Sequence, residues 1–199
     1  MKDQWYADNR DLVKWGVLLN IARHHAAARI LQVAYYRSNE WGHLEIDGEK
    51  CPIPDAVLRH FRDVRKIKEL SANPRIEVVE AKFADRGQYA EAVLKAIASR
   101  PNGEACVVFL DPDTGLAPRR PLLDHALESE LTDIWHHMSV GDVLVFYQHQ
   151  TNRNGEQWIE PKREQFERAL GLPRGMAKVA VGTAIARDVA LFYCCKDAA

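Results

Sequence analysis

The feature that most constrains this chain is a short, continuously apolar segment near its centre. Residues 105–110 read ACVVFL and run directly into the acidic turn DPDTG at 111–115. A run of this length without polar alternation is typical of a strand that is covered on both faces in a parallel sheet. A second strand-like segment, VLVFYQH at 143–149, begins with an apolar run and follows a predicted helix at 121–138. This alternation of strands and helices predicts an α/β fold with a mostly parallel sheet.

The periodicity of apolar residues outlines the rest of the fold. The last two apolar runs, 178–185 and 189–195, are separated by too few residues for a helical crossover, so we expect them to form an antiparallel hairpin. The first helix is expected to bury Leu12, Trp15 and Leu19. The other predicted strands are 29–36 and 75–83, the other predicted helices are 9–27, 54–70, 86–99 and 158–170, and 37–53 is predicted to be a long polar loop.

Length and composition limit the possible functional classes. The chain has 199 residues with 27 basic and 28 acidic side chains, and its net charge of −1 is atypical of a general nucleic-acid coat protein. The length predicts a single domain, 1–199, with the helical segment 1–28 packed on the sheet. Its apolar runs are far shorter than the ~20 residues of a membrane span, and its first residues lack a signal-peptide core. We therefore expect a soluble, cytoplasmic protein without a membrane partner.

Candidate site residues gather where the predicted parallel strands end. Ligands of open α/β sheets bind beyond the carboxyl ends of the strands, and these ends carry Glu80, Asp111, Asp113, His149 and Arg153. Asp is also an ordinary turn former, so Asp111 and Asp113 have a structural alternative as caps of the turn. Two carboxylates at the end of one core strand repel each other, however, and a plain turn does not require both. We therefore interpret Asp111, Asp113 and His149 as catalytic candidates, and Arg153 as a candidate for binding phosphate.

A second group of polar residues lies at the start of the first helix. Asp8, Asp11 and Lys14 are spaced by three and share one helical face. Their structural alternative is an N-cap at Asp8, a first-turn acid at Asp11 and an ion pair between Asp11 and Lys14. As functional residues they would bind substrate or phosphate. In that case we expect at least one of them to reach the carboxyl ends of the sheet near Asp111.

The order of elements over residues 75–195 resembles the methyltransferase-like variant of the Rossmann fold. In addition, Asp111-Pro112 is similar to the first half of the acidic-Pro-Pro-aromatic motif that holds the target nitrogen in nucleic-acid amino-methyltransferases. The resemblance implies adenosylmethionine as cofactor, Glu80 at its ribose, and a nucleotide or nucleic acid as substrate. The second proline, the aromatic residue and the glycine-rich cofactor loop of those enzymes have no counterpart in this sequence.

Two further resemblances imply metal-dependent chemistry. The segment DPDT at 111–114 is similar to the phosphatase motif of haloacid-dehalogenase-like enzymes, and PD at 54–55 with EAK at 80–82 is similar to the PD…ExK pattern of metal-dependent nucleases. They imply a divalent-metal-dependent phosphoesterase or nuclease, with Mg²⁺ or Mn²⁺ held by the three catalytic candidates named above. A further alternative keeps the fold without catalysis, as a module that binds a nucleotide or nucleic acid.

Three segments together resemble a family of prokaryotic proteins to which no reaction is assigned. They are YADNRDLVKWG at 6–16, DPDTG at 111–115 and YQHQTNR at 147–153. That family combines an aromatic-Asp-Asp-Lys start with a DPDxG strand end and a YQH strand end. The resemblance implies that the acidic residues and the lysine of the first segment share one site with Asp111 and His149.

We therefore predict a mostly parallel Rossmann-like, methyltransferase-like α/β sheet flanked by helices, with a C-terminal antiparallel hairpin. The favoured function is an enzyme acting on a nucleotide or nucleic acid, in which Asp111 orients or deprotonates a substrate group. Asp113 and His149 would assist that step, and Lys14 or Arg153 would meet phosphate.

Overall fold

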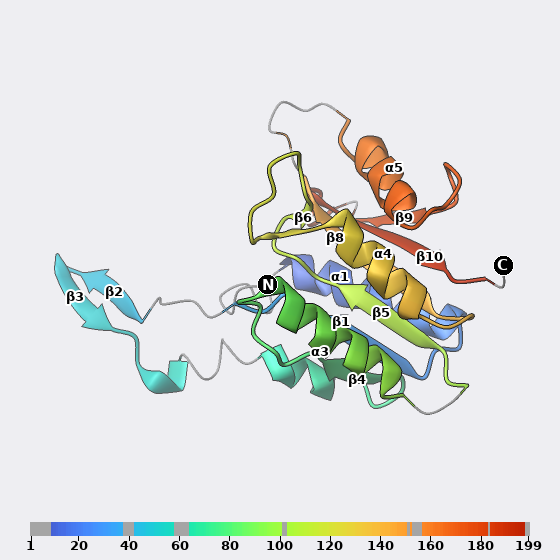
Figure 1. The fold of residues 1–199 in the computed structure, drawn as a ribbon. Helices are drawn as coiled ribbons and strands as arrows, with labels where there is room; N and C mark the ends of the chain where they lie inside the picture. The colour runs from blue at the N-terminus through green and yellow to red at the C-terminus, as the bar shows by residue number, and fades with distance from the viewer. Residues whose placement is uncertain are drawn as a thin grey trace.

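The computed structural model describes residues 9–37, 42–57, 64–100, 103–150, 152, 157–182 and 184–197. Its elements alternate between helices and strands along most of the chain (Figure 1). In chain order they are α1 (Asn9–His24), β1 (Arg29–Val33), β2 (His43–Ile46), β3 (Glu49–Pro52), η2 (Val64–Leu70), β4 (Arg75–Val78), α3 (Arg86–Ala98), β5 (Cys106–Leu110), β6 (Gly115–Leu116), β7 (His125–Ala126), α4 (Glu128–His137), β8 (Val143–His149), α5 (Ile159–Ala169), β9 (Lys178–Val181) and β10 (Val189–Cys195).

Six of the strands form one twisted central sheet in the order β4-β1-β5-β8-β10-β9. The first four, β4, β1, β5 and β8, are parallel to one another. Strand β10 is antiparallel to both β8 and β9. The predicted central position of β5, its parallel pairing with β8 and the terminal antiparallel hairpin are therefore confirmed. The fold is a Rossmann-like α/β fold.

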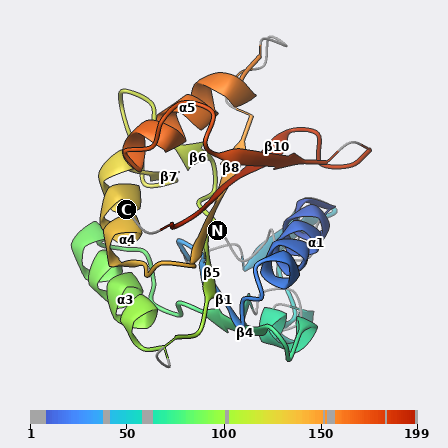
Figure 2. The same ribbon diagram turned by 90° about the vertical axis from the view of Figure 1, so that its right-hand side faces the viewer.

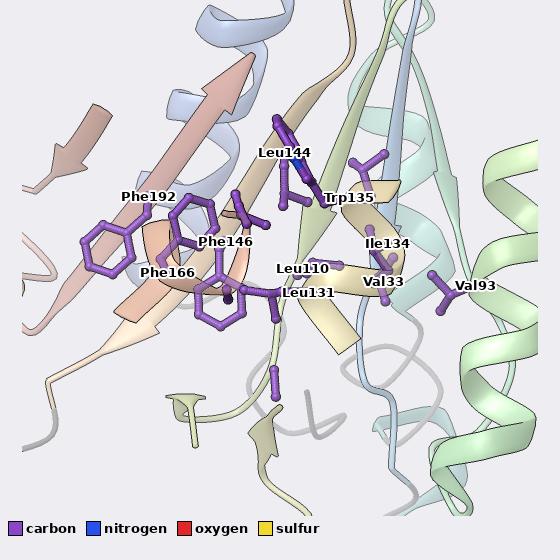
Figure 3. Packing of buried hydrophobic residues seen from close by; sticks show 14 of the residues in the cluster. Val33, Val93, Leu110, Leu131, Ile134, Trp135, Leu144, Phe146, Phe166 and Phe192 are labelled. Carbon is purple, nitrogen blue, oxygen red and sulfur yellow. The ribbon is translucent and has the colours of Figure 1, made fainter. Parts of the chain in front are cut away.

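Helices cover both faces of this sheet, as Figure 2 shows: α3, α4 and α5 lie on one face, and α1 and η2 lie on the other. The side chains of the central strands alternate between the two cores. On the α4 and α5 face, Phe166 packs between Phe146 and Phe192 with ring centroids 6.0 and 5.9 Å apart (Figure 3). On the α1 face, Trp15 meets Phe109 edge to face. Burial on both faces explains why β5, and β8 up to Phe146, are continuously apolar.

The order of the strands creates a switch point between β1 and β5. The chain passes from β1 to β4 on one side, and then from β4 to β5 on the other side of β1. In open α/β sheets, ligands bind in the crevice outside the carboxyl ends of the strands at such a point. Residues 34–37, which follow β1, and residues 111–113, which follow β5, lie there.

Several sequence-based expectations about elements were wrong. The helix predicted at 54–70 is a 3-10 helix over Val64–Leu70, and residues 58–63 of that prediction lie outside the described residues. The segment 37–53 is not a loop throughout, because β2 and β3 pair as a hairpin around Asp47 and Gly48, both with positive φ. The helix predicted at 121–138 begins only at Glu128. The preceding residues 125–126 pair with β6 instead, and the side chain of Glu130 accepts a hydrogen bond from the backbone N–H of Leu127.

The buried face of α1 also differs from the expected one. Leu12 is 65% exposed and Leu19 is only half-buried, whereas Trp15 is buried as expected. The helix is rotated so that two charged side chains, Asp11 and Lys14, are buried together with its apolar residues. The buried residues of α1 are Asp11, Lys14, Trp15, Leu18, Ile21 and Ala22.

Gly115 and Gln148 join the two strand-end motifs into one unit. The Gln148 amide donates to the backbone oxygens of Thr114 and His149, and its Oε1 accepts from the backbone N–H of Leu116 at 2.9 Å. Gly115 has a φ of +111°, and a Cβ at this position would lie 2.4 Å from the Gln148 side chain. The turn after β5 is therefore fixed against the end of β8, and only glycine fits at its closest approach.

Replacing this glycine should test the connection. We expect Gly115→Ala to reduce the free energy of unfolding by about 2–4 kcal/mol, because it combines backbone strain with a steric clash. Gly141→Ala is the matched control, since Gly141 also has a positive φ, +88°, but a Cβ there would meet nothing within 4 Å. Chemical denaturation of both variants measures the difference. Equal losses in the two would show that the contact with Gln148 is unimportant.

Candidate functional site

Five polar side chains are buried between α1 and the carboxyl ends of β1, β5 and β8. We call them the buried polar cluster: Asp11, Lys14, Gln32, Asp111 and Tyr147. Asp11 and Lys14 come from α1, Gln32 from β1, Asp111 directly follows β5, and Tyr147 belongs to β8. They converge because odd-numbered residues of β5 and β8 and even-numbered residues of β1 face α1.

An ammonium group lies at the centre of the cluster. Lys14 Nζ is 2.9 Å from Asp111 Oδ1, 3.2 Å from Asp11 Oδ1 and 4.2 Å from the centroid of the Tyr147 ring. The second carboxylate oxygen of Asp111 accepts a hydrogen bond of 3.1 Å from Gln32 Nε2. The expectation that the first helix reaches the carboxyl ends of the sheet is thus confirmed for Lys14. The same lysine offsets the carboxylate repulsion expected at Asp111.

Burial and charge act in opposite directions on Lys14. Burial alone would lower its pKa, but the adjacent carboxylates of Asp111 and Asp11 raise it above the usual lysine value of 10.5. Lys14 is therefore protonated across the physiological pH range, and its ammonium is shared between two carboxylates. The pKa of Tyr147 is raised, mainly by burial and also by Asp111, so its hydroxyl keeps its proton.

The cluster has one unused hydrogen-bond acceptor. Within the described part of the chain, the buried Oε1 of Gln32 has no hydrogen-bond partner. Gln32 itself is only 2% exposed. A buried polar atom without a partner costs about 1–3 kcal/mol, so stability alone does not favour glutamine here.

A second ion pair spans the switch point at the rim of the cluster. Asp113, two residues beyond Asp111, pairs with the guanidinium of Arg37, which lies beyond the end of β1. Burial alone would raise the pKa of Asp113, but the positive charges around it, Arg37 among them, lower the pKa below its usual value. The Asp113 and Arg37 side chains are 13% and 21% exposed, so this pair is more accessible than Asp111.

His149 belongs to a third group, with Asp188 and Arg10. His149 Nε2 is 3.0 Å from Asp188 Oδ2, and Nδ1 is 3.0 Å from the backbone oxygen of Gln150. Both partners are acceptors, so both contacts are hydrogen bonds at once only in the protonated ring. Asp188 also accepts from Arg10 Nε at 3.2 Å, and Arg10 and His149 contribute to lowering its pKa against the effect of burial.

Sequence reasoning missed Arg10, Arg37 and Asp188. Asp188 directly precedes β10, whose first residue, Val189, is paired with His149 in the antiparallel register. The short turn between the last two strands could therefore have indicated that Asp188 lies close to His149. The contacts of Arg10 and Arg37 have no such signal, because they depend on how α1 and the end of β1 are placed in space.

Other predicted site residues are not brought into this region. Glu80 is exposed, and its carboxylate accepts from Lys68 Nζ at 2.6 Å on η2. Asp8 and Arg153 lie outside the described residues. Asp111, Asp113 and His149 each face a different partner. The described residues contain no group of three or more His, Cys, Asp or Glu side chains arranged to hold a metal ion.

The turn after β1 does not fit the adenosylmethionine cradle that the methyltransferase resemblance implies. Tyr35 occupies the left-handed region there, with a φ of 47°, and its side chain is buried. Its backbone N–H donates to the hydroxyl of Tyr89 at 2.8 Å, and its own hydroxyl lies 3.4 Å from Glu130 Oε2. Aromatic packing thus fills the place where a glycine-rich loop would let the backbone approach a cofactor.

Comparison of the chain with protein-family models finds no match, and comparison with curated proteins finds none either. Within the part of the chain that the structure describes, no helix is both long and apolar enough to cross a membrane. The assignment of a function therefore depends on the geometry of the site.

The two ends of the central ion pair should respond differently to substitution. Lys14→Met leaves the carboxylates of Asp11 and Asp111 buried without their shared cation, and we expect it to lower the free energy of unfolding at pH 7 by about 3–5 kcal/mol. Asp111→Asn should leave stability unchanged or raise it, since the Gln32 amide can rotate to accept from the new amide group.

Urea denaturation of both variants at pH 7 measures these effects. In the wild type, the raised pKa of Lys14 stabilises the fold below 10.5, and this contribution is lost only as the pH rises above that value. A Lys14→Met variant as stable as the wild type at pH 7 would contradict the account. So would an Asp111→Asn variant about 1 kcal/mol less stable than the wild type, as expected for a lost structural cap.

Proposed function

We propose that this chain is an enzyme that acts on a nucleotide or a nucleic acid at the carboxyl edge of its sheet. Its strand order, with an antiparallel β10 between β8 and β9, resembles the methyltransferase-like variant of the Rossmann fold. Doubly wound sheets of this kind commonly bind nucleotides at the switch point. This part of the proposal is an analogy between folds, and the residues at the switch point supply the rest.

One observation carries the proposal: the buried Lys14–Asp111 pair lies at the switch point. An apolar pair of similar volume is often at least as stabilising as a buried ion pair, because desolvation offsets the Coulomb attraction. This chain instead buries two carboxylates, an ammonium and an incompletely bonded amide in the crevice where ligands of such folds bind. Clusters with perturbed pKa values in that place are typical of functional sites.

Exposure assigns different roles to the acidic residues. Asp111 is 1% exposed, so we propose that it positions Lys14 and the turn that carries Asp113. Asp113 is accessible and accepts a hydrogen bond or a proton from a substrate N–H or O–H group. His149 is held through Nε2 by Asp188 and through Nδ1 by the backbone oxygen of Gln150, and it donates a proton when the substrate displaces one of these contacts.

Arg37 is the proposed phosphate-binding residue. Its guanidinium lies beyond β1 beside Asp113, and a planar guanidinium binds phosphate through two parallel hydrogen bonds. A phosphate that replaced Asp113 as the partner of Arg37 would remove this contact from the Asp113 carboxylate and make the carboxylate more available to the substrate. Binding of the substrate and activation of the acid–base group would then be one event.

The proposal includes no step through adenosylmethionine, because the turn after β1 does not fit it. The phosphoesterase alternative requires Asp111, Asp113 and His149 on one metal ion, and their separate partners do not favour that arrangement. A non-catalytic nucleotide-binding module uses the same contacts as the proposed enzyme. It differs from the enzyme only in lacking turnover.

Ligand-induced thermal stabilisation tests the binding part of the proposal. We expect one of the four ribonucleoside monophosphates, or a short single-stranded oligonucleotide, to raise the melting temperature of the wild type. Arg37→Gln should weaken that ligand by at least about tenfold, as expected for the loss of a charged hydrogen bond. Arg163→Gln is the matched control, since Arg163 pairs with Glu160 on α5, away from the switch point.

Adenosylhomocysteine and Mn²⁺ belong in the same experiment as competing probes. A shift with Mn²⁺ that Asp113→Asn abolishes would favour the metal-dependent alternative. The proposal is contradicted when no nucleotide or oligonucleotide shifts the melting temperature. It is equally contradicted when the shift is the same in Arg37→Gln as in the wild type.

A further inference from the structure

The β2–β3 hairpin stands clear of the rest of the protein. Figure 1 shows it projecting beyond the carboxyl edge of the sheet, with only the short helical turn at 55–57 beside it. Every residue of the two strands except Cys51 is exposed. An isolated two-stranded hairpin is at best marginally stable in water, and its free edges are open to pairing with another chain. This hairpin therefore needs a surface to cover it.

One face of the hairpin is apolar. Leu44 and Ile46 are two residues apart on β2 and point to the same side, and each is 53% exposed. Cys51, on the same face, is paired with Leu44 in the register of the hairpin. These side chains form a small apolar strip that the protein leaves in contact with water.

The charge of the hairpin indicates what kind of surface fits it. Its acidic residues, Glu45, Asp47 and Glu49, outnumber its one basic residue, Lys50. This excess repels phosphate, so the hairpin is unsuited to nucleic acid. It favours a basic surface that also has an exposed apolar side chain.

The same chain carries such a surface on η2. This short helix has three basic residues against one acidic residue, and its Leu70 is 51% exposed. Its basic residues are Arg65, Lys66 and Lys68, of which Lys68 is paired with Glu80 in the same molecule. Within one molecule the hairpin and η2 lie well apart, as Figure 1 shows. The acidic hairpin therefore does not meet the basic helix of its own chain.

We propose that a second copy of the chain covers the hairpin, and that each copy places its hairpin on η2 of the other. Because the two copies make the same contact with each other, they form a closed dimer around a two-fold axis. Both hairpins are then covered. Leu44 and Ile46 pack toward the partner's Leu70, and Glu49, which shares their face, lies with Asp47 of the turn opposite the partner's basic residues. This inference does not depend on the proposed function.

Analytical ultracentrifugation across micromolar concentrations tests the dimer. We expect the wild type to sediment as twice the 22.6 kDa mass of the chain. Asp47→Asn with Glu49→Lys makes the hairpin basic, and Arg65→Glu with Lys66→Glu makes η2 acidic. Each of these double variants alone should weaken the dimer by at least about tenfold, because like charges then face each other. Glu91→Lys, on the exposed surface of α3, is the control and should leave the dimer intact.

Charge-reversal rescue makes the test specific. An equimolar mixture of the hairpin variant and the η2 variant should form a heterodimer, since each hairpin then meets an η2 of opposite charge. Thermal melting confirms that each variant is folded. A monomeric wild type would overturn the proposal, as would a dimer that survives both single-surface variants. Variants that dissociate but do not recover when mixed would also overturn it, because the two surfaces would then not be partners.

Discussion

The ion pair between Lys14 and Asp111 is the interaction on which the rest of the site depends. It joins the first helix to the end of the central strand through two side chains that are both buried. Lys14 has to face inward for this contact, so the whole of α1 takes the rotation that exposes Leu12 and buries Leu18. A pair that costs desolvation and dictates the orientation of a helix is better explained by the ligand site than by stability alone.

The turn that follows Asp111 is held in place by residues on the opposite face of the sheet, the face covered by α5. Gln148 fixes the turn 114–116, and Gly115 permits the close approach that this requires. Lys162 and Gln165 on α5 donate to the backbone oxygens of Leu116 and Ala117, both at 2.9 Å. Asp111 and Asp113 are therefore presented on a turn that is fixed at its far end, which is the kind of support that precise positioning of acid–base groups needs.

Much of the fold could be predicted from sequence, because burial on both faces leaves a continuous apolar run in β5 and β8. The orientation of α1 could not, since periodicity assigns charged residues such as Asp11 and Lys14 to solvent. Their burial depends on Asp111, a partner far away in the chain. The β2–β3 hairpin had a local signal, an Asp-Gly pair between alternating residues, which the polar composition of the segment obscured. Asp111 and His149 were correctly placed at strand ends, but the structure gives them different partners.

The central claim is that the crevice between β1 and β5 binds a ligand beside the buried pair. An NMR titration of the ¹⁵N-labelled protein with nucleoside monophosphates tests it most directly, with the side-chain signals of Gln32 Nε2 and Arg37 Nε as reporters. The account predicts that both signals move and saturate together with one dissociation constant, because Gln32 lies in the buried polar cluster and Arg37 at its rim. Signals that shift only elsewhere in the protein, while these two stay unchanged at saturation, would contradict it.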